Sequence, residues 1–195
     1  MKHWLVIDLE ATTDDGGWPI EKMEIIEIGA VIVDEHGREQ DHFQSFVRPT
    51  RCPQLTAFCR QLTHIRQADV DGAPTLLQLQ ASFEPWLQQH LACLQGWLSW
   101  GNYDRQQFEV EWRRQRIASG LAGLPHFNLK KLFNRQFKDS AGRKQVGLNR
   151  ALEQAGLEFR GTQHRGIDDA RNIARLLPLT LPTLAAARLE LRTPH

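Results

Sequence analysis

The sequence predicts a mixed α/β fold, in which a sheet that begins with three antiparallel strands is covered by helices. Three apolar, extended segments follow one another within the first 47 residues. The apolar positions change to a helical period from about residue 75. A further strand-like run near residue 97 leads directly into another helical pattern, so the second half of the chain alternates strands and helices.

The first third of the chain is predicted to form the antiparallel strands. Residues 4–7 are rich in β-formers, residues 25–33 are a longer run rich in Ile and Val, and residues 43–47 alternate. Connections this short imply antiparallel neighbours. Residues 14–19 contain two glycines and a proline, which predict a loop. We expect this loop at the mouth of the functional site.

The middle of the chain changes to a helical period. Apolar residues recur at helical spacing over residues 76–87, and Thr75 is a plausible N-cap. A short apolar run at residues 96–100 predicts the next strand. A helical pattern through Phe108 and Trp112 follows it, so this strand runs into a helix.

Three further segments complete the predicted body of the fold, and the last two are predicted helices. We expect Pro178 and Pro182 to end the last helix, because proline removes a backbone donor and clashes with the preceding turn. Residues 184–191 are expected to add a final helix. The three segments are residues 127–137, residues 148–155 and residues 167–177.

The length of 195 residues suits one domain, and no repeat, low-complexity tract or linker divides the chain. We therefore expect one domain over residues 1–195. Its core is expected at about residues 4–177, followed by a helical tail over residues 182–195.

Composition bears on whether the protein lies in a membrane, is secreted or stays in the cell. With 41% hydrophobic residues, 24% charged residues and no run near the ~18 apolar residues of a membrane span, the chain is expected to have no membrane partner. Its start lacks the apolar core of a signal peptide. Cys52, Cys59 and Cys93 are an odd number with no Cys-x-x-Cys pair, which suits free thiols. We expect a cytoplasmic protein.

Charge is distributed unevenly along the chain although the net charge is only +1. Residues 1–100 hold 7 Lys and Arg against 14 Asp and Glu, whereas residues 101–175 hold 15 against 8. A metal-using nuclease needs acidic residues that bind metal and basic residues that bind phosphates, and this charge distribution could supply both. Two solvated faces would explain the same counts.

Three acids lie at predicted strand ends. Asp8 and Glu10 are two residues apart on one strand, so both point to the same face, with Cα atoms roughly 6.5–7 Å apart. Two buried carboxylates repel each other unless a cation neutralises them. A chance pair at a strand exit is the alternative. Asp104 directly follows the later strand and joins the pair if that strand lies beside the first.

A histidine precedes two aspartates at the start of the predicted helix 167–177, in His164-Arg-Gly-Ile-Asp-Asp169. Helical spacing aligns Asp168 with Arg171, Asn172 and Arg175 on an exposed polar face. The same spacing aligns Asp169 with Ile173 and Leu176, so Asp169 is expected to point toward the sheet. Oxygen ligands of this kind select Mg²⁺ or Mn²⁺ rather than zinc.

The ordered acids and histidine resemble the DEDDh class of 3′-to-5′ exonucleases, and further motifs resemble its Eri-type branch, which includes the histone-mRNA 3′ exonuclease and Snipper. These matches span about residues 4–177. The motifs are Asp8-Leu-Glu-Ala-Thr12, Pro53-Gln-Leu-Thr-Ala-Phe-Cys59, Leu62-Thr63-His-Ile65, Ala73-Pro-Thr75, Ser99-Trp-Gly101 and His164-Arg-Gly-Ile-Asp-Asp-Ala-Arg-Asn-Ile-Ala174.

The resemblance implies a ribonuclease-H-like fold with a mixed five-stranded sheet, two Mg²⁺ or Mn²⁺ ions, and release of nucleoside 5′-monophosphates from 3′ ends of single-stranded RNA or DNA. Tyr103 stands where relatives commonly carry Trp, and Arg165 stands where a related subclass carries its catalytic Tyr. His164 is therefore the expected base. The implied site residues are Asp8, Glu10, Asp104 and Asp169 for metal, His164 and Glu10 for catalysis, and Ala11, Thr12, Phe58, Leu62, Tyr103 and His164 for the nucleotide.

Two other functions stay open at this point. The chain could be a non-catalytic regulator that binds nucleic acid or protein on the same fold, or a phosphodiesterase for short oligonucleotides. A pure binding protein has no need of a charge cluster that destabilises the empty site, which argues against the first.

Overall fold

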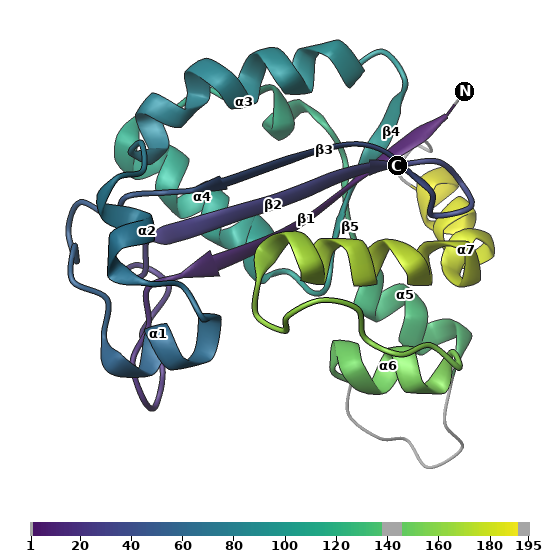
Figure 1. Ribbon diagram of the computed structural model, residues 1–195. Helices are drawn as coiled ribbons and strands as arrows, with labels where there is room; N and C mark the ends of the chain where they lie inside the picture. The colour runs from purple at the N-terminus through teal and green to yellow at the C-terminus, as the bar shows by residue number, and fades with distance from the viewer. Residues whose placement is uncertain (1, 138–145, 191–195) are drawn as a thin grey trace.

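The sheet contains five strands in the order β3-β2-β1-β4-β5 (Figure 1). The computed structural model describes residues 2–137 and 146–190. β1, β2 and β3 pair in antiparallel fashion, whereas β4 is parallel to β1 and β5 is parallel to β4. This arrangement confirms the predicted ribonuclease-H-like mixed sheet. The strands are β1 (His3–Ala11), β2 (Ile25–Val33), β3 (Glu39–Phe46), β4 (Leu94–Ser99) and β5 (His126–Asn128).

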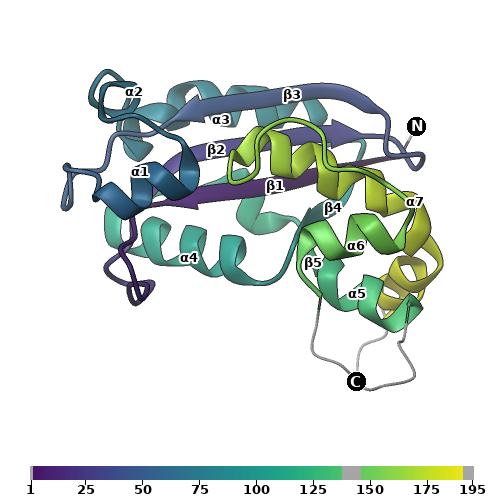
Figure 2. The same cartoon turned by 60° about the horizontal axis from the view of Figure 1, so that its bottom comes forward.

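Helices cover both faces of the sheet (Figures 1 and 2). α3 and α4 lie on one face, α5, α6 and α7 lie on the other, and α1 and α2 lie at the end where β1 finishes. The helices of the described residues are α1 (Ala57–Thr63), α2 (Gln67–Asp71), α3 (Leu76–His90), α4 (Tyr103–Gln115), α5 (Leu129–Gln136), α6 (Leu148–Gln154) and α7 (Gly166–Glu190), with a 3-10 helix at Gly120–Gly123.

The alternation of side chains along β1 separates two cores. Leu5, Ile7 and Leu9 pack in the core beneath α3 and α4. Trp4 and Val6 pack in the core beneath α5, α6 and α7. Because side chains two apart share a face, the next two residues of the second series, positions 8 and 10, face α7.

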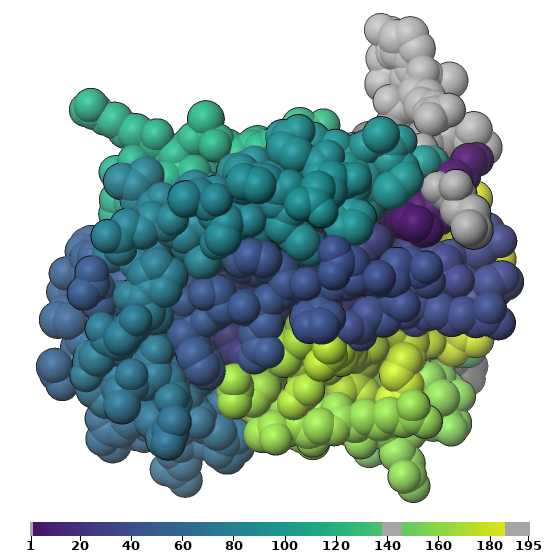
Figure 3. Space-filling model, turned by 45° about the horizontal axis from the view of Figure 1, so that its top comes forward, coloured from purple at the N-terminus to yellow at the C-terminus, as the bar shows by residue number. Residues whose placement is uncertain are grey.

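β3 is an edge strand that crosses the surface between α3 and α7 (Figure 3). Most of its side chains are exposed or half-buried, whereas every residue of β2 is buried. Charged residues on an exposed edge disfavour pairing with another chain, and β3 carries Glu39 and Asp41. The buried part of the sheet is therefore centred on β1 and β2.

α7 does not end at the two prolines, so the predicted helix break was wrong. The helix runs from Gly166 to Glu190 through Pro178 and Pro182. Leu177 before the first proline and Leu184 after the second are both fully buried in the same core. That burial offsets the backbone hydrogen bonds that the prolines remove. The predicted final helix at residues 184–191 is part of α7 as far as Glu190. Residues 191–195 lie outside the described residues.

α1 and α2 were not predicted. α1 has only seven residues and α2 only five, too few to display a helical period clearly. α1 begins at the N-cap Thr56, whose hydroxyl oxygen accepts a hydrogen bond from the Cys59 amide at 3.0 Å. Its buried side chains are Cys59 and Thr63, so α1 has little apolar signal.

In the part of the chain that the structure describes, no helix combines the length and the apolar character needed to cross a bilayer.

Candidate functional site

Two neighbouring parallel strands bring the first three predicted acids together. β4 lies beside β1, as the expectation for Asp104 required. α4 begins directly after β4, and Asp104 lies in its first turn. The Asp104 carboxylate accepts a hydrogen bond from the amide of Leu9 at 3.0 Å. Asp104 is therefore held against β1 at the position between Asp8 and Glu10.

Two glycines bring the start of α7 into contact with the same part of the sheet. A β-carbon on Gly29 of β2 would lie 2.0 Å from the carbonyl carbon of Gly166. A β-carbon on Gly166 would lie 2.9 Å from the backbone oxygen of Asp8. Only residues without side chains permit this approach. As a result, Asp169 in the first turn of α7 faces β1 and is 8% exposed.

Glu10, His164 and Asp169 form a group that could hold a metal ion. One potential ligand atom from each residue lies within 4.8 Å of the other two. Asp8 and Asp104 are outside this group of three, yet their charges act on it. Burial raises the pKa of Asp8 and of Glu10 well above their usual values, and the charges of neighbouring carboxylates raise both pKa values further.

The other two acids are also perturbed. Burial raises the pKa of Asp104 to about 6 and that of Asp169 to about 7. Among the described residues, none of the four carboxylates forms an ion pair with lysine or arginine. Buried acids without a cationic partner resist ionisation unless a cation joins them. The donor set of carboxylate oxygens and one imidazole nitrogen fits a divalent metal ion.

The histidine sits in a loop held by both aspartates that follow it. His164 has a positive φ of 59°, and its amide donates to Asp169 Oδ2 at 2.9 Å. The amide of Thr162 donates to Asp168 Oδ2 at 2.8 Å. Burial, with a smaller contribution from His64, lowers the pKa of His164. The imidazole is thus favoured in its neutral form, which can accept a proton.

The expected orientation of the helix start is correct for Asp169 and wrong for Asn172, and Asp168, expected on an exposed face, is half-buried. Asp169 faces the sheet, and Ile173 is fully buried as predicted. Asn172 was expected on an exposed face, yet it is fully buried. Its side chain accepts from the amide of Arg160 at 3.0 Å and donates to the Arg160 carbonyl at 2.7 Å. Asn172 therefore anchors the loop before α7 rather than facing water.

A buried ion pair beneath the loop was not predicted. Glu27 of β2 lies opposite Glu10 in the strand register and is fully buried. Arg165 donates to it from Nε at 3.0 Å, and the amide of Gly166 donates to it at 3.1 Å. These partners are 138 and 139 residues away along the chain, so no local pattern could pair them.

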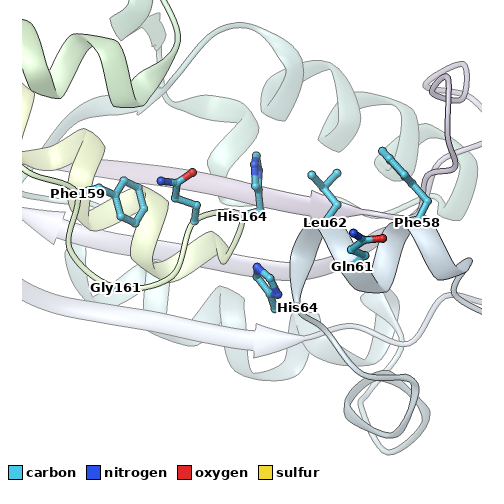
Figure 4. Close-up of a pocket in the computed structure, with 8 residues that line it drawn as sticks. Phe58, Gln61, Leu62, His64, Phe159, Gly161 and His164 are labelled. Atoms are coloured by element: carbon cyan, nitrogen blue, oxygen red, sulfur yellow. The ribbon is translucent and has the colours of Figure 1, made fainter.

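A cleft of about 650 Å³ opens beside His164 (Figure 4). This volume lies within the range of small-molecule sites. α1 and its C-cap contribute one wall, and the loop before α7 contributes the other. The lining residues are Phe58, Gln61, Leu62, His64, Phe159, Gly161, Gln163 and His164.

The cleft contains only some of the predicted nucleotide-binding residues. Phe58, Leu62 and His164 line it, whereas Ala11, Thr12 and Tyr103 do not. The Thr12 hydroxyl oxygen accepts from the Glu24 amide at 2.9 Å. The Tyr103 hydroxyl donates to Gln107 at 3.3 Å, and burial raises its pKa. The roles expected for these three residues stay predictions.

The other five lining residues were not predicted. Gln61, His64, Gln163, Gly161 and Phe159 belong to no catalytic pattern that composition or spacing reveals. Two of them flank predicted residues directly, because Gln61 precedes Leu62 and Gln163 precedes His164. Adjacency could have identified these two, and His64 lies inside the quoted motif Leu62-Thr63-His-Ile65.

The chain is similar to known exonucleases in sequence. The family model RNase_T, described as Exonuclease, matches residues 5–177. The mouse protein 3′-5′ exoribonuclease 1 is 33% identical over 180 residues, which cover 88% of this chain and 50% of the relative. The chain thus spans about half the length of the mammalian relatives of this name.

Solved structures are similar over most of the chain. The nuclease domain of 3′hExo, a DEDDh family member, bound to rAMP, has a TM-score of 0.81 and 30% identity, covering 95% of this chain and 92% of that one. A 3′-exonuclease in a structure of 3′-end specific recognition of histone mRNA stem-loop has a TM-score of 0.81 and 29% identity. That similarity covers 91% of this chain and 64% of the other.

Proposed function

Because the chain belongs to the exonuclease family whose model matches residues 5–177, we propose that it hydrolyses single-stranded nucleic acid from the 3′ end. Each cycle would release one nucleoside 5′-monophosphate. The observation that carries the proposal is the convergence of Glu10, His164 and Asp169 within 4.8 Å, with His164 lining the cleft. Two segments far apart in sequence, β1 and the loop that leads into the first turn of α7, supply that convergence.

Divalent metal ions are typical of this family, and the residues present fit them. We propose two ions, Mg²⁺ or Mn²⁺, held by Asp8, Glu10, Asp104 and Asp169. When bound, such ions activate water and stabilise the charge that develops at a scissile phosphate. The raised pKa of each carboxylate supports this assignment, since these groups lack another cation among the described residues.

His164 is the proposed general base. Its lowered pKa leaves an imidazole nitrogen free to accept the proton of the attacking water at neutral pH. Such help is worth roughly 10²–10⁴-fold in rate. The hydrogen bond from the His164 amide to Asp169 fixes the base relative to a proposed metal ligand. Glu10, within the same group, is proposed to orient the water as well as to bind metal.

The terminal nucleotide is proposed to bind in the cleft on the α1 side. Phe58 and Leu62 line this part, and a Phe ring stacks on any base because every base has a π-face. Ala11 ends β1, Thr12 lies in the loop after it, and Tyr103 begins α4. We propose that they border the same nucleotide from the metal side.

RNA is the first substrate to test, because the mouse and human relatives are named 3′-5′ exoribonuclease 1 and one of the similar structures is bound to rAMP. DNA remains part of the proposal, since nothing in the described cleft singles out a 2′-hydroxyl. A regulator without catalysis is not favoured, because the metal-binding set of acids and the histidine are all present.

We also propose that the protein works in a reducing compartment such as the cytoplasm. Its three cysteines are free thiols in the structure. Cys59 is fully buried, and burial raises the pKa of its thiol, which makes it unreactive.

The test is incubation with matched 5′-labelled RNA and DNA strands, with Mg²⁺ or Mn²⁺ or with excess EDTA. A ladder that shortens from the 3′ end only with metal is the expected result. Linear strands with a 3′-phosphate and circular strands should resist. Undiminished cleavage in EDTA, or equal cleavage of circular strands, would refute the proposal. Cleavage of dinucleotides without any shortening of the long strands would instead indicate the oligonucleotide phosphodiesterase.

A further inference from the structure

The cleft extends to both sides of His164 (Figure 4). Leu62 and Phe58 of α1 lie on one side, and Phe159 lies on the other. The proposed function puts the terminal nucleotide against α1 and the bond to be cut beside His164. The next nucleotide of the strand continues away from that bond, so it meets the part of the cleft around Phe159.

We propose that Phe159, His64 and Gln163 form a second subsite, which binds the nucleotide next to the 3′-terminal one. The base of this nucleotide lies against the Phe159 ring, and its sugar-phosphate lies near His64 and Gln163. This inference rests on the proposed exonuclease function, and it specifies that the site holds two nucleotides of the strand rather than one.

The position of Phe159 suits a stacking platform. One part of the side chain packs against the core beneath α7, and the residue remains half-buried while lining the cleft. A ring anchored by packing loses little further freedom when a base covers it. Base stacking tolerates any sequence, which suits an enzyme that must accept each successive nucleotide.

His64 has a backbone conformation that only a few residue types adopt readily. It is the C-cap of α1 with a φ of 59°, a region favoured by Gly and Asn. Its exposed side chain lines the cleft, and no hydrogen bond of that side chain is found within the described residues. The left-handed conformation ends α1, with the His64 amide donating to the Arg60 carbonyl, and the imidazole is left available to a ligand.

Charge beyond Phe159 indicates where the strand continues. A second hollow of about 290 Å³ shares Gly161 with the cleft. Part of its charge is already paired, since Arg171 donates to Glu39 at 2.9 Å. Cations still outnumber acids there, which favours phosphates on this side. The charged residues that line the hollow are Arg160, Arg171, Arg175, Glu39 and Asp168.

The test uses the metal-loaded enzyme and single strands with one abasic sugar. In wild-type enzyme, an abasic sugar next to the 3′-terminal nucleotide should lower kcat/KM about tenfold, whereas one three positions further should not. The variant Phe159→Leu keeps apolar packing but removes the ring. It should cleave the intact strand about tenfold less efficiently and show no further loss with the abasic strand. Equal additional losses in both enzymes would overturn the subsite.

His64→Gly gives an independent check that does not depend on packing, because glycine adopts this φ freely. Its thermal stability should equal or exceed that of the wild type. KM for the intact strand should rise several-fold with kcat nearly unchanged, and unchanged KM would contradict the assignment. If wild-type enzyme releases no mononucleotide from any strand, the exonuclease function itself fails, an outcome distinct from either of these.

Discussion

Arg165 donates two hydrogen bonds to the fully buried carboxylate of Glu27, from Nε at 3.0 Å and from a terminal guanidinium nitrogen at 3.1 Å. Gln44 also donates to this carboxylate, at 2.7 Å. Arg165 directly follows His164, and Glu27 lies opposite Glu10. The pair therefore ties the loop with the proposed base to the strand beside the proposed metal ligands.

Arg165→Met should destabilise the fold and reduce turnover. Without the guanidinium, the Glu27 charge stays buried and unpaired, which costs about 3 kcal/mol in the free energy of unfolding. Urea unfolding measures that loss. Adding Glu27→Gln to the variant removes the unpaired charge and should restore much of the stability, but not the position of the loop. If the double variant regained full turnover, the pair would not position His164.

Gly29→Ala should be far more damaging than its small volume suggests. The added carbon would meet the backbone of Gly166 at 2.0 Å, and backbone cannot rotate out of the way. Overpacking of this kind costs about 1–3 kcal/mol or more, and it moves α7 away from Asp8. Gly123→Ala is the matched control, because nothing lies within 4 Å of its added carbon. Similar melting temperatures for the two variants would exclude the proposed close contact.

The main features of the sheet and of the acidic cluster were predictable, because both depend on local patterns. Alternation placed Asp8 and Glu10 on one face, and helical spacing placed Asp169 toward the sheet. The contacts of Glu27 with Arg165 and of Gly29 with Gly166 join segments more than a hundred residues apart. Such contacts depend on the assembled fold and leave no periodic signal.

The helix ends were less predictable. Pro178 and Pro182 are strong local breakers, yet burial of the apolar stripe on both sides of them keeps α7 continuous. α1 is too short for its period to be visible, although Thr56 supplies an N-cap. The wall of the cleft that α1 forms was for this reason visible only through the family resemblance around Phe58.

The metal-free protein should lose stability as the pH rises, and metal should reverse the loss. The pKa values of Asp104 and Asp169 are raised to about 6 and about 7, against ~3.9 in an unfolded chain. The folded state then binds more protons between about pH 4 and pH 7, so stability falls across that window. Calorimetry of the EDTA-treated protein measures this slope.

Mn²⁺ should raise the melting temperature more at about pH 8 than at about pH 5, because carboxylate ligands must be deprotonated to bind metal. Metal at 100 times its Kd adds about 2.7 kcal/mol. Sodium chloride at equal ionic strength is the control. A metal-free stability that rose across the same window would contradict the raised pKa values of the cluster.

Asp169→Asn and Asp168→Asn should differ sharply, although the two residues are neighbours. Asp169→Asn keeps an oxygen for the His164 amide but removes a proposed metal ligand, so activity should fall by roughly 100-fold or more. Metal-free stability at about pH 8 should rise, because a buried charge is lost. Asp168→Asn keeps an acceptor for the Thr162 amide. It should change stability by at most about 1 kcal/mol and retain most activity.

Both variants are purified and compared by circular dichroism before rates with Mg²⁺ are measured, so that misfolding is separated from loss of a ligand. Asp168→Ala adds a control for the loop, since it removes the acceptor of Thr162 as well as the charge. It should raise KM by loosening the cleft wall near Gly161 while leaving metal affinity intact. The reverse order, with Asp168→Asn inactive and Asp169→Asn active, would place the metal site on the other face of α7.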